Sequence, residues 1–157
     1  MKLFLQAIFA LSLITSCSSN NSNDRDWPIV TVQDIDGVNI NSSVVFNNNT
    51  TVIALWSTTC IPCRVELPQL QEFAATHPEI DVIAVNLGDV PKSVKQYVQE
   101  LGLTMPVIID FEGRVSTALG ITSLPSTLVL SPAGKVVTTH LGEINAAELA
   151  LLVETSS

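Results

Sequence analysis

The chain has 157 residues, of which 46% are hydrophobic, and it carries a formal net charge of -8. This length and composition suit one compact domain with a hydrophobic core, and they argue against two domains or a disordered chain. The acidic balance excludes a nucleic-acid-binding surface, because neutralising phosphates requires clustered cations.

The N-terminal residues predict export from the cytoplasm. One cation, Lys2, precedes an apolar run from Leu3 to Ile14. The run is shorter than the ~20 residues that a membrane-spanning helix needs. It leads into the residues LITSC, with an aliphatic residue three positions before Cys17 and small residues between, which resembles the processing box of bacterial lipoproteins. That resemblance implies cleavage before Cys17 and lipid attachment to it, and the alternatives are an ordinary signal peptide cut elsewhere or an uncleaved anchor.

Three parts of the chain follow from this interpretation. We expect a lipoprotein signal peptide at residues 1–16, a polar tether at 17–26 and one folded domain at 27–157. The segment 18–24 is free of apolar residues, as a flexible tether should be. The expected location is the periplasmic side of a bacterial membrane, with the protein held there by the lipid on Cys17.

The cysteine count restricts the chemistry further. The chain has three cysteines, and a lipidated Cys17 leaves only Cys60 and Cys63. Exported proteins occupy compartments in which disulfides persist. The remaining pair can therefore hold a disulfide at rest unless another molecule supplies electrons to it.

Strand-like and helix-like runs alternate along the rest of the chain. The residues TVIALW at 51–56 are a continuous apolar run, typical of a strand buried on both faces. The next segment places Val65, Leu67, Leu70, Phe73 and Ala74 at roughly helical spacing, with Pro68 inside it as an expected kink. The expected strands are 29–32, 38–40, 51–56, 81–86, 106–110, 126–131 and 135–140, and the expected helices are 62–76, 92–101, 113–119 and 146–153. This alternation predicts an α/β fold with a mixed sheet flanked by helices.

The segment WSTTCIPCRVELP places two cysteines at the start of the first predicted helix. The first turn of a helix presents unpaired N–H groups and the positive end of the helix dipole, so Cys60 should be the more acidic and more exposed thiol. Cys63 lies about one turn further and faces inward, where it can attack a mixed disulfide on Cys60. Pro62 lacks an N–H group, and this loss costs nothing so early in a helix.

Three other roles could in principle be assigned to such a pair of cysteines. A purely structural disulfide is poorly supported, because this disulfide closes a very short loop and the stabilisation grows with loop length. A zinc site needs four ligands, but the sequence has no second CxxC, and the only histidines, His77 and His140, are far apart in sequence. A Cu(I) carrier stays open as an alternative, because two thiolates can hold Cu(I).

With these residues in place, the sequence resembles the TlpA/ResA-like extracytoplasmic thiol–disulfide oxidoreductases of the thioredoxin superfamily. The resemblance extends from about residue 28 to residue 143. It includes WSTTCIPCRVELP, then MPVIIDFEGRVSTALGI, and then GITSLPST followed by LVL. It implies a thioredoxin-like fold with an N-terminal hairpin and the helix–strand insert of this class.

The resemblance also implies a substrate groove. In the family, the proline at the position of Pro125 is cis and lies against the two cysteines. It would expose the backbone of Leu124, so that a substrate segment can pair with it as an added strand. The residue-level alternative is an ordinary proline at the start of a strand. The expected groove residues are Trp56, Pro62, Leu124 and Pro125.

Two positions depart from the family pattern. Thioredoxins carry a buried Asp where this chain has Ala54, which cannot transfer a proton. Proton transfer to or from Cys63 must then use water or another carboxylate, and Glu66 and Glu100 are the candidate carboxylates. The alternative is that both are solvated helix charges. Thr59 replaces the tryptophan that usually precedes the first cysteine.

We therefore expect a membrane-tethered reductase of disulfides in exported proteins, acting as a monomer. Cys60 attacks the substrate disulfide and Cys63 resolves the mixed disulfide. No metal or organic cofactor is required, but a thiol-reducing electron donor in the membrane must restore the dithiol. The alternatives are a supplier of reductant for apocytochrome c thiols and the Cu(I) carrier. The direction of electron flow is open, because about 30 mV already shifts this equilibrium by ~1.4 kcal/mol.

Overall fold

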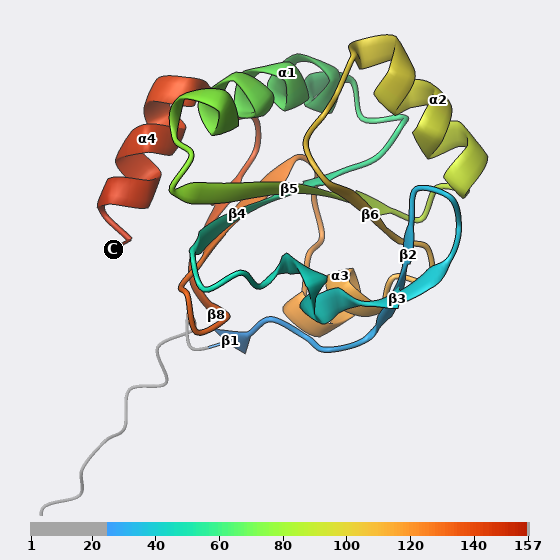
Figure 1. Ribbon diagram of the computed structural model, residues 1–157. Coiled ribbons are helices and arrows are strands. Elements are labelled where there is room, and N and C mark those ends of the chain that lie inside the picture. Colours follow the sequence, from blue (N-terminus) through green and yellow to red (C-terminus); the bar gives the residue numbers. More distant parts are fainter. Residues whose placement is uncertain (1–24, 157) are drawn as a thin grey trace, which may run out of the picture.

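The computed structural model describes residues 25–156 (Figure 1). The predicted signal peptide, Cys17 and the tether up to residue 24 lie outside these residues. Arg25 and Asp26 already form a short strand, so the folded part includes these two residues ahead of Trp27. Within residues 25–156, no helix combines the length and the apolar composition needed to cross a membrane.

The described residues form strands and helices in alternation, as the sequence predicts. The strands are β1 (Arg25–Asp26), β2 (Thr31–Asp34), β3 (Asn39–Asn41), β4 (Thr50–Trp56), β5 (Ile80–Leu87), β6 (Val107–Asp110), β7 (Ser126–Leu130) and β8 (Lys135–Leu141). The helices are the 3-10 turn η1 (Ser42–Val45), α1 (Ile61–Thr76), α2 (Pro91–Leu101), α3 (Arg114–Leu119) and α4 (Ala146–Glu154). The short elements β1 and η1 were not predicted.

All the strands described join one sheet in the order β1-β8-β7-β4-β5-β6-β2-β3. β4, β5 and β6 run parallel to one another, and the other neighbouring pairs are antiparallel. The predicted mixed α/β fold and the predicted hairpin at β2 and β3 are confirmed. β4 is therefore a central strand of the sheet, and the two cysteines follow it at the start of α1.

Helices cover both faces of the sheet, and each face has its own apolar core (Figure 1). α1, α2 and α4 pack on one face, where they meet Val52, Ala54 and Trp56 of β4. On the opposite face, Ile53 and Leu55 of β4 pack against residues of η1 and α3. A strand that alternates between two cores must be apolar at every position, which is why TVIALW shows no polar alternation.

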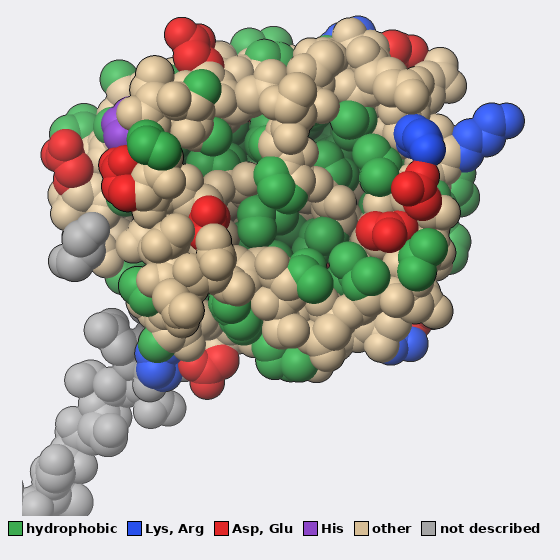
Figure 2. All heavy atoms as spheres, viewed as in Figure 1, with side chains coloured by type: hydrophobic (Ala, Val, Ile, Leu, Met, Phe, Trp, Pro, Cys, Tyr) green, Lys and Arg blue, Asp and Glu red, His purple; other side chains and the backbone are tan. Residues whose placement is uncertain are grey.

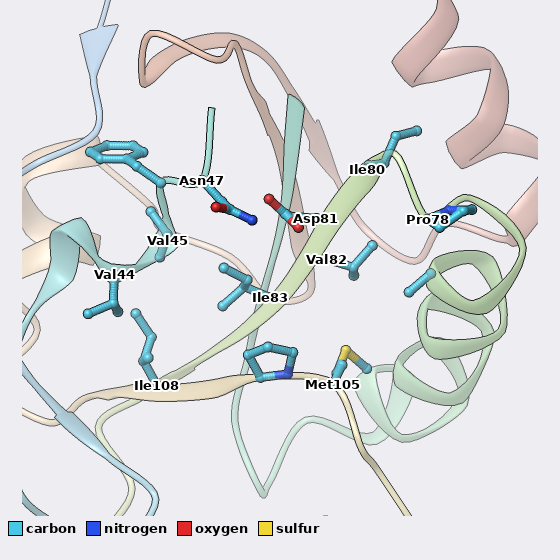
Figure 3. A pocket seen from close by; sticks show the side chains of 13 residues that line it. Val44, Val45, Asn47, Pro78, Ile80, Asp81, Val82, Ile83, Met105 and Ile108 are labelled. Carbon is cyan, nitrogen blue, oxygen red and sulfur yellow. The ribbon is translucent and has the colours of Figure 1, made fainter. Parts of the chain in front are cut away.

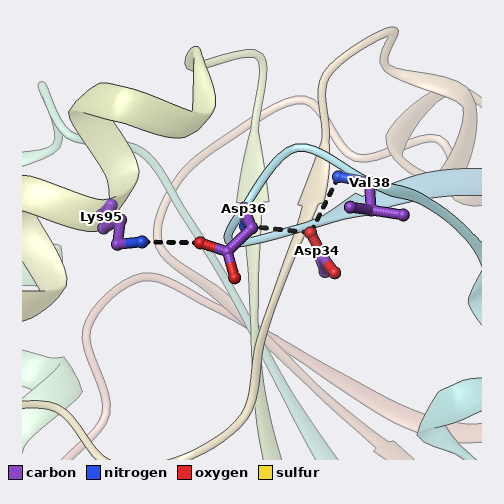
Figure 4. A network of polar contacts seen from close by, with 4 residues as sticks. All are labelled: Asp34, Asp36, Val38 and Lys95. Atoms are coloured by element: carbon purple, nitrogen blue, oxygen red, sulfur yellow. Dashed lines mark hydrogen bonds and ion pairs between the residues drawn. The ribbon is translucent and has the colours of Figure 1, made fainter.

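The turn between β2 and β3 is held by two carboxylates (Figure 4). Oδ1 of Asp34 accepts hydrogen bonds from the amides of Asp36 and Val38, each at 2.9 Å. The carboxylate of Asp36 accepts a hydrogen bond from the Lys95 ammonium of α2 at 2.6 Å, and this contact raises the pKa of Lys95. The pair is solvent-exposed, so it contributes little stability, but it fixes the hairpin beside α2.

Two leucines of α4 provide a matched test of this core. Leu149 is 0% exposed and Leu151 is 62% exposed. We expect Leu149→Ala to lower the free energy of unfolding by about 2–5 kcal/mol, because it leaves a cavity in the core. Leu151→Ala should change it by less than about 0.5 kcal/mol. Urea unfolding of the oxidised protein measures both values, and equal losses in the two variants would contradict the packing of α4.

Candidate active site

The two cysteines lie where β4 passes into α1 and are joined as a disulfide. Cys60 is the N-cap residue of α1, and its Sγ accepts a hydrogen bond from the amide of Cys63 at 3.3 Å. Cys60 is partly exposed, whereas Cys63 is 1% exposed and belongs to the core. Only Cys60 is therefore open to a partner's sulfur.

The loop that precedes Cys60 is fastened to the loop between β5 and α2. The amide of Thr58 donates to Oδ2 of Asp89 at 2.7 Å, and its hydroxyl donates to Oδ1 at 2.9 Å. The buried side chain of Asn86 also donates to Oδ2 of Asp89, at 2.8 Å. One carboxylate thus joins two loops and holds the backbone that leads into Cys60.

The segment before β7 forms the other wall of the site. The bond between Leu124 and Pro125 is cis, as the family resemblance implied. Pro125 is buried, while Leu124 is partly exposed and packs against the same core as Cys60. Among residues 25–156, the N–H and C=O groups of Leu124 have no hydrogen-bond partner. They are free to pair with an extended segment from another molecule.

Two of the expected groove residues differ in exposure. Trp56 is 1% exposed, and its ring packs against Tyr97 of α2 with centroids 5.1 Å apart. It therefore supports the site from behind and offers no surface to a substrate. Pro62 is exposed in the first turn of α1.

Glu66 and Glu100, the two candidate proton carriers, occupy very different environments. Glu100 is on the surface, where its side chain is 45% exposed and pairs with Arg64 at 3.8 Å. It is a solvated helix charge. Glu66 is 1% exposed and lies in the core one turn beyond Cys63. Only Glu66 shares the buried face of α1 with Cys63.

The carboxyl group of Glu66 is held by two neutral donors. The hydroxyl of Thr127 donates to Oε1, and the amide of Ile144 donates to Oε2, each at 3.2 Å. Burial raises the pKa of Glu66 from 4.5 to about 7, since these two hydrogen bonds only partly offset the loss of hydration. The charge of Glu143 raises this pKa slightly and that of His140 lowers it.

Glu66 lies close to the strand position occupied by Ala54. Ala54 of β4 lies opposite Thr127 of β7 in the sheet, and Thr127 is the residue that holds Glu66. The small side chain of Ala54 and the carboxyl of Glu66 therefore belong to the same region of the core. The pKa of about 7 allows this carboxyl to give or take a proton near neutral pH.

Sequence reasoning missed Thr127 and the pair of Asp89 and Asn86. Asp89 is 31 positions from Thr58 in the chain, and Thr127 is 61 positions from Glu66. No local pattern connects residues at such separations. Among the described residues, no group of three or more His, Cys, Asp or Glu side chains could hold a metal ion.

Comparison with known proteins agrees with this geometry. A model of the AhpC/TSA family matches residues 24–139. The thiol–disulfide oxidoreductase ResA of Halalkalibacterium halodurans is 27% identical over 151 residues, which cover 90% of this chain and 85% of that protein. The sporulation thiol–disulfide oxidoreductase A of Bacillus subtilis is 29% identical over 104 residues, 63% of each chain. The crystal structure of StoA from Bacillus subtilis superposes with a TM-score of 0.68 at 25% identity, covering 81% of this chain and 97% of that one.

The raised pKa of Glu66 predicts a pH-dependent stability. Between pH 4.5 and about 7 the folded protein keeps the proton that the unfolded chain has lost, so the free energy of unfolding should fall as pH rises through this window. The whole fall is on the order of 3 kcal/mol, at about 1.4 kcal/mol per pKa unit. Glu66→Gln should remove this dependence, and the measurement is urea unfolding of both oxidised proteins from pH 4.5 to 8.

Above pH 7, the free energies of unfolding of the wild type and of Glu66→Gln should change with pH in parallel. Glu100→Gln is the matched control, because it removes an exposed carboxylate from α2 and should leave the pH dependence in place. Equal slopes for the wild type and Glu66→Gln between pH 4.5 and 7 would show that Glu66 titrates normally.

Proposed function

Because this chain belongs to the AhpC/TSA family of the thioredoxin superfamily, we propose that it is a reductase of disulfides in exported proteins, with Cys60 and Cys63 as its catalytic pair. It is a thiol–disulfide oxidoreductase, like the relatives that it matches. The observation that carries the proposal is the asymmetry of the pair: a partly exposed sulfur at the N-terminus of α1 and a buried one beside Glu66.

The first step uses Cys60 alone. In the reduced protein, the thiolate of Cys60 is stabilised by the amides of the first turn of α1, including the amide of Cys63. This thiolate attacks one sulfur of the substrate disulfide. A bond forms between Cys60 and that sulfur, and the substrate's other sulfur leaves as a thiolate and takes up a proton.

The second step uses Cys63 and Glu66. Cys63 must lose its proton before it can attack Cys60 in the mixed disulfide. Glu66, one helical turn away and with a pKa of about 7, is the acceptor we assign. Cys63 then forms the disulfide with Cys60 that the structure contains, and the substrate leaves with its second sulfur as a thiolate, fully reduced.

The substrate would approach along the segment before β7. The unpaired backbone groups of Leu124 can bind an extended segment as an added strand, which places the substrate's sulfur beside Cys60. We assign the exposed side chains of Thr59 and Pro62 to the rim of this groove and the buried Pro125 to its wall. The short polar Thr59 leaves this rim smaller and more polar than the tryptophan common in the family.

Location and partners rest on the sequence. We propose that a lipid on Cys17 holds the protein at the periplasmic side of a bacterial membrane, and that residues 18–24 act as its tether. Each catalytic cycle leaves the pair oxidised, so two electrons must come from a thiol-reducing donor, which we place in the same membrane. Apocytochrome c thiols before haem attachment are one narrower class of substrate for the same chemistry.

Cysteine variants test the assigned roles. With Cys63→Ser, Cys60 should form a mixed disulfide that persists, because no sulfur is left to resolve it. With Cys60→Ser, no such adduct should form, since Cys63 is buried. Non-reducing gel electrophoresis of the full-length variants in a bacterial periplasm measures both.

A Cu(I) carrier would behave differently in the same experiments. It would trap no protein through Cys60, and the reduced wild type would bind Cu(I) tightly at a ratio of one to one without reducing disulfides. That combination would overturn the oxidoreductase assignment.

The role of Glu66 predicts a change in rate as well as in stability. Glu66→Gln cannot accept a proton from Cys63, so the resolution of the mixed disulfide should slow by at least about tenfold at pH 7. Stopped-flow reduction of a small disulfide, followed from pH 5 to 9, measures this step. In the wild type the rate should rise through the pKa of Glu66, about 7, and in the variant this inflection should be absent.

Glu100→Gln serves as the matched control and should keep the wild-type profile. Retention of the inflection near pH 7 in Glu66→Gln would assign the proton transfer to water instead.

A further inference from the structure

A second, unexplained feature lies at the opposite end of the sheet from the cysteines. Apolar side chains gather in a hollow at the centre of the face in Figure 2. The hollow has a volume of about 510 Å³ and opens beside the first half of β5 (Figure 3). Because β4 and β5 are parallel, the start of β5 is far along the sheet from the end of β4, where Cys60 follows. None of the assigned site residues lines this hollow.

The floor of the hollow is an open strand edge. β6 pairs with β5 only from Ala84 onward, so Ile80 to Ile83 have no neighbouring strand on that side. The amide of Ala84 donates to the carbonyl of Pro106 at 2.9 Å. Backbone groups alternate in direction along a strand, so the N–H and C=O of Val82 point to the same open side. In the part of the chain that the structure describes, neither of them has a partner.

The sequence explains why β6 cannot close this edge. Continued pairing would require the N–H of residue 106 to donate to the carbonyl of Val82, and Pro106 has no N–H. The two preceding amides, of Thr104 and Met105, donate instead to the side chain of Gln71 on α1. The chain before β6 is thereby held toward the helix and away from the edge of β5.

The two walls of the hollow differ in chemistry. Ala74, Pro78 and Met105 line the side of α1 and are apolar. The other wall is formed by η1 and the residues after it and is also largely apolar, and the side chain of Asp81 on β5 points toward this side (Figure 3). Oδ2 of Asp81 is buried and has no hydrogen-bond partner among the residues described. A buried carboxylate oxygen without a partner is costly, so this wall is suited to a cation.

We propose that this hollow binds an extended segment of a partner protein, which adds to the edge of β5 as a further strand and places a lysine or arginine beside Asp81. The backbone of such a segment would pair with the free N–H and C=O of Val82. Its alternate side chains would point to the two walls, apolar ones toward α1 and the basic one toward Asp81.

Two other occupants fit the hollow less well. A second copy of this chain would have to bring its own recessed edge into the recess, and two concave surfaces cannot meet in this way. Such pairing would also bring two Asp81 carboxylates together, and like charges on neighbouring strands repel. Residues 18–24 of this chain, SSNNSND, offer neither an apolar nor a basic side chain. An extended segment of a different protein can fit the apolar wall, the Asp81 carboxylate and the open edge of β5 together.

A labelled pentapeptide of sequence valine-lysine-valine-threonine-valine tests the proposal with the full chain. Fluorescence anisotropy should show saturable binding with a Kd below about 1 mM. In the free protein, hydrogen exchange measured by NMR should be faster at the Val82 amide than at the bonded Ala84 amide, and the peptide should slow the exchange of Val82 at least about tenfold. Disulfide exchange at Cys60 should be unchanged by the peptide, which separates this test from that of the proposed function.

Variants of the protein and of the peptide test the charged contact and the backbone contact separately. Asp81→Asn should weaken binding by about fivefold or more, because it removes the charge that faces the lysine. Glu79→Gln removes an exposed carboxylate two residues away, outside the hollow, and should leave the Kd unchanged. A peptide with glutamate in place of lysine, or one with methylated backbone nitrogens, should bind more weakly than the parent.

Three results would overturn the proposal. One is an absence of saturable binding up to about 1 mM. Another is a Val82 amide that exchanges as slowly as that of Ala84 in the free protein. The third is a dimer in sedimentation experiments whose formation protects Val82, because it would assign the edge to a second copy.

Discussion

The burial of β4 on both faces is the constraint on which the rest of the molecule depends. Its residues from Val52 to Trp56 are at most 1% exposed, so other elements must cover the sheet on each side. The neighbouring strands also contribute side chains to the apolar cores on the two faces. The chain leaves β4 at Trp56 and begins α1 at Ile61, with only a short loop between. This connection places Cys60 at the N-terminus of a helix, where a thiolate is most stable, and turns Cys63 into the core. The asymmetry of the redox pair is therefore a consequence of how the central strand is packed.

The same packing produces the unusual carboxyl group. Glu66 is on the face of α1 that covers the sheet. Its pKa is raised to about 7, because its carboxyl group is shielded from water and accepts hydrogen bonds only from the Thr127 hydroxyl and the Ile144 amide. Ala54 on the neighbouring strand pairs with Thr127, so a small side chain stands beside the residue that holds this carboxyl. The burial of Glu66 therefore raises its pKa into the range in which the proposed proton transfer from Cys63 can occur.

The sequence predicted the elements whose patterns are local and failed where partners are distant. The apolar run of β4 and the alternation of strands and helices identified the fold, and the residues around the cysteines and Pro125 identified the family. Arg25 and Asp26 form β1 by pairing with β8, which is distant in the sequence, so no local pattern predicts this strand. On α1, helical spacing grouped Val65 with the apolar face, yet Val65 is 53% exposed and Glu66 is buried. Only contacts with β7 and with Ile144 decide which way that turn faces.

The central claim is that the Cys60–Cys63 pair gives electrons to other disulfides. The reduction potential of the pair at pH 7, measured by equilibration with thiol–disulfide buffers and mass analysis of alkylated thiols, tests it most directly. A reductase should have a potential near that of thioredoxin, about -270 mV, and in any case below about -200 mV. A potential near -120 mV, the value of a strong oxidant such as DsbA, would contradict the direction of electron flow proposed for this protein.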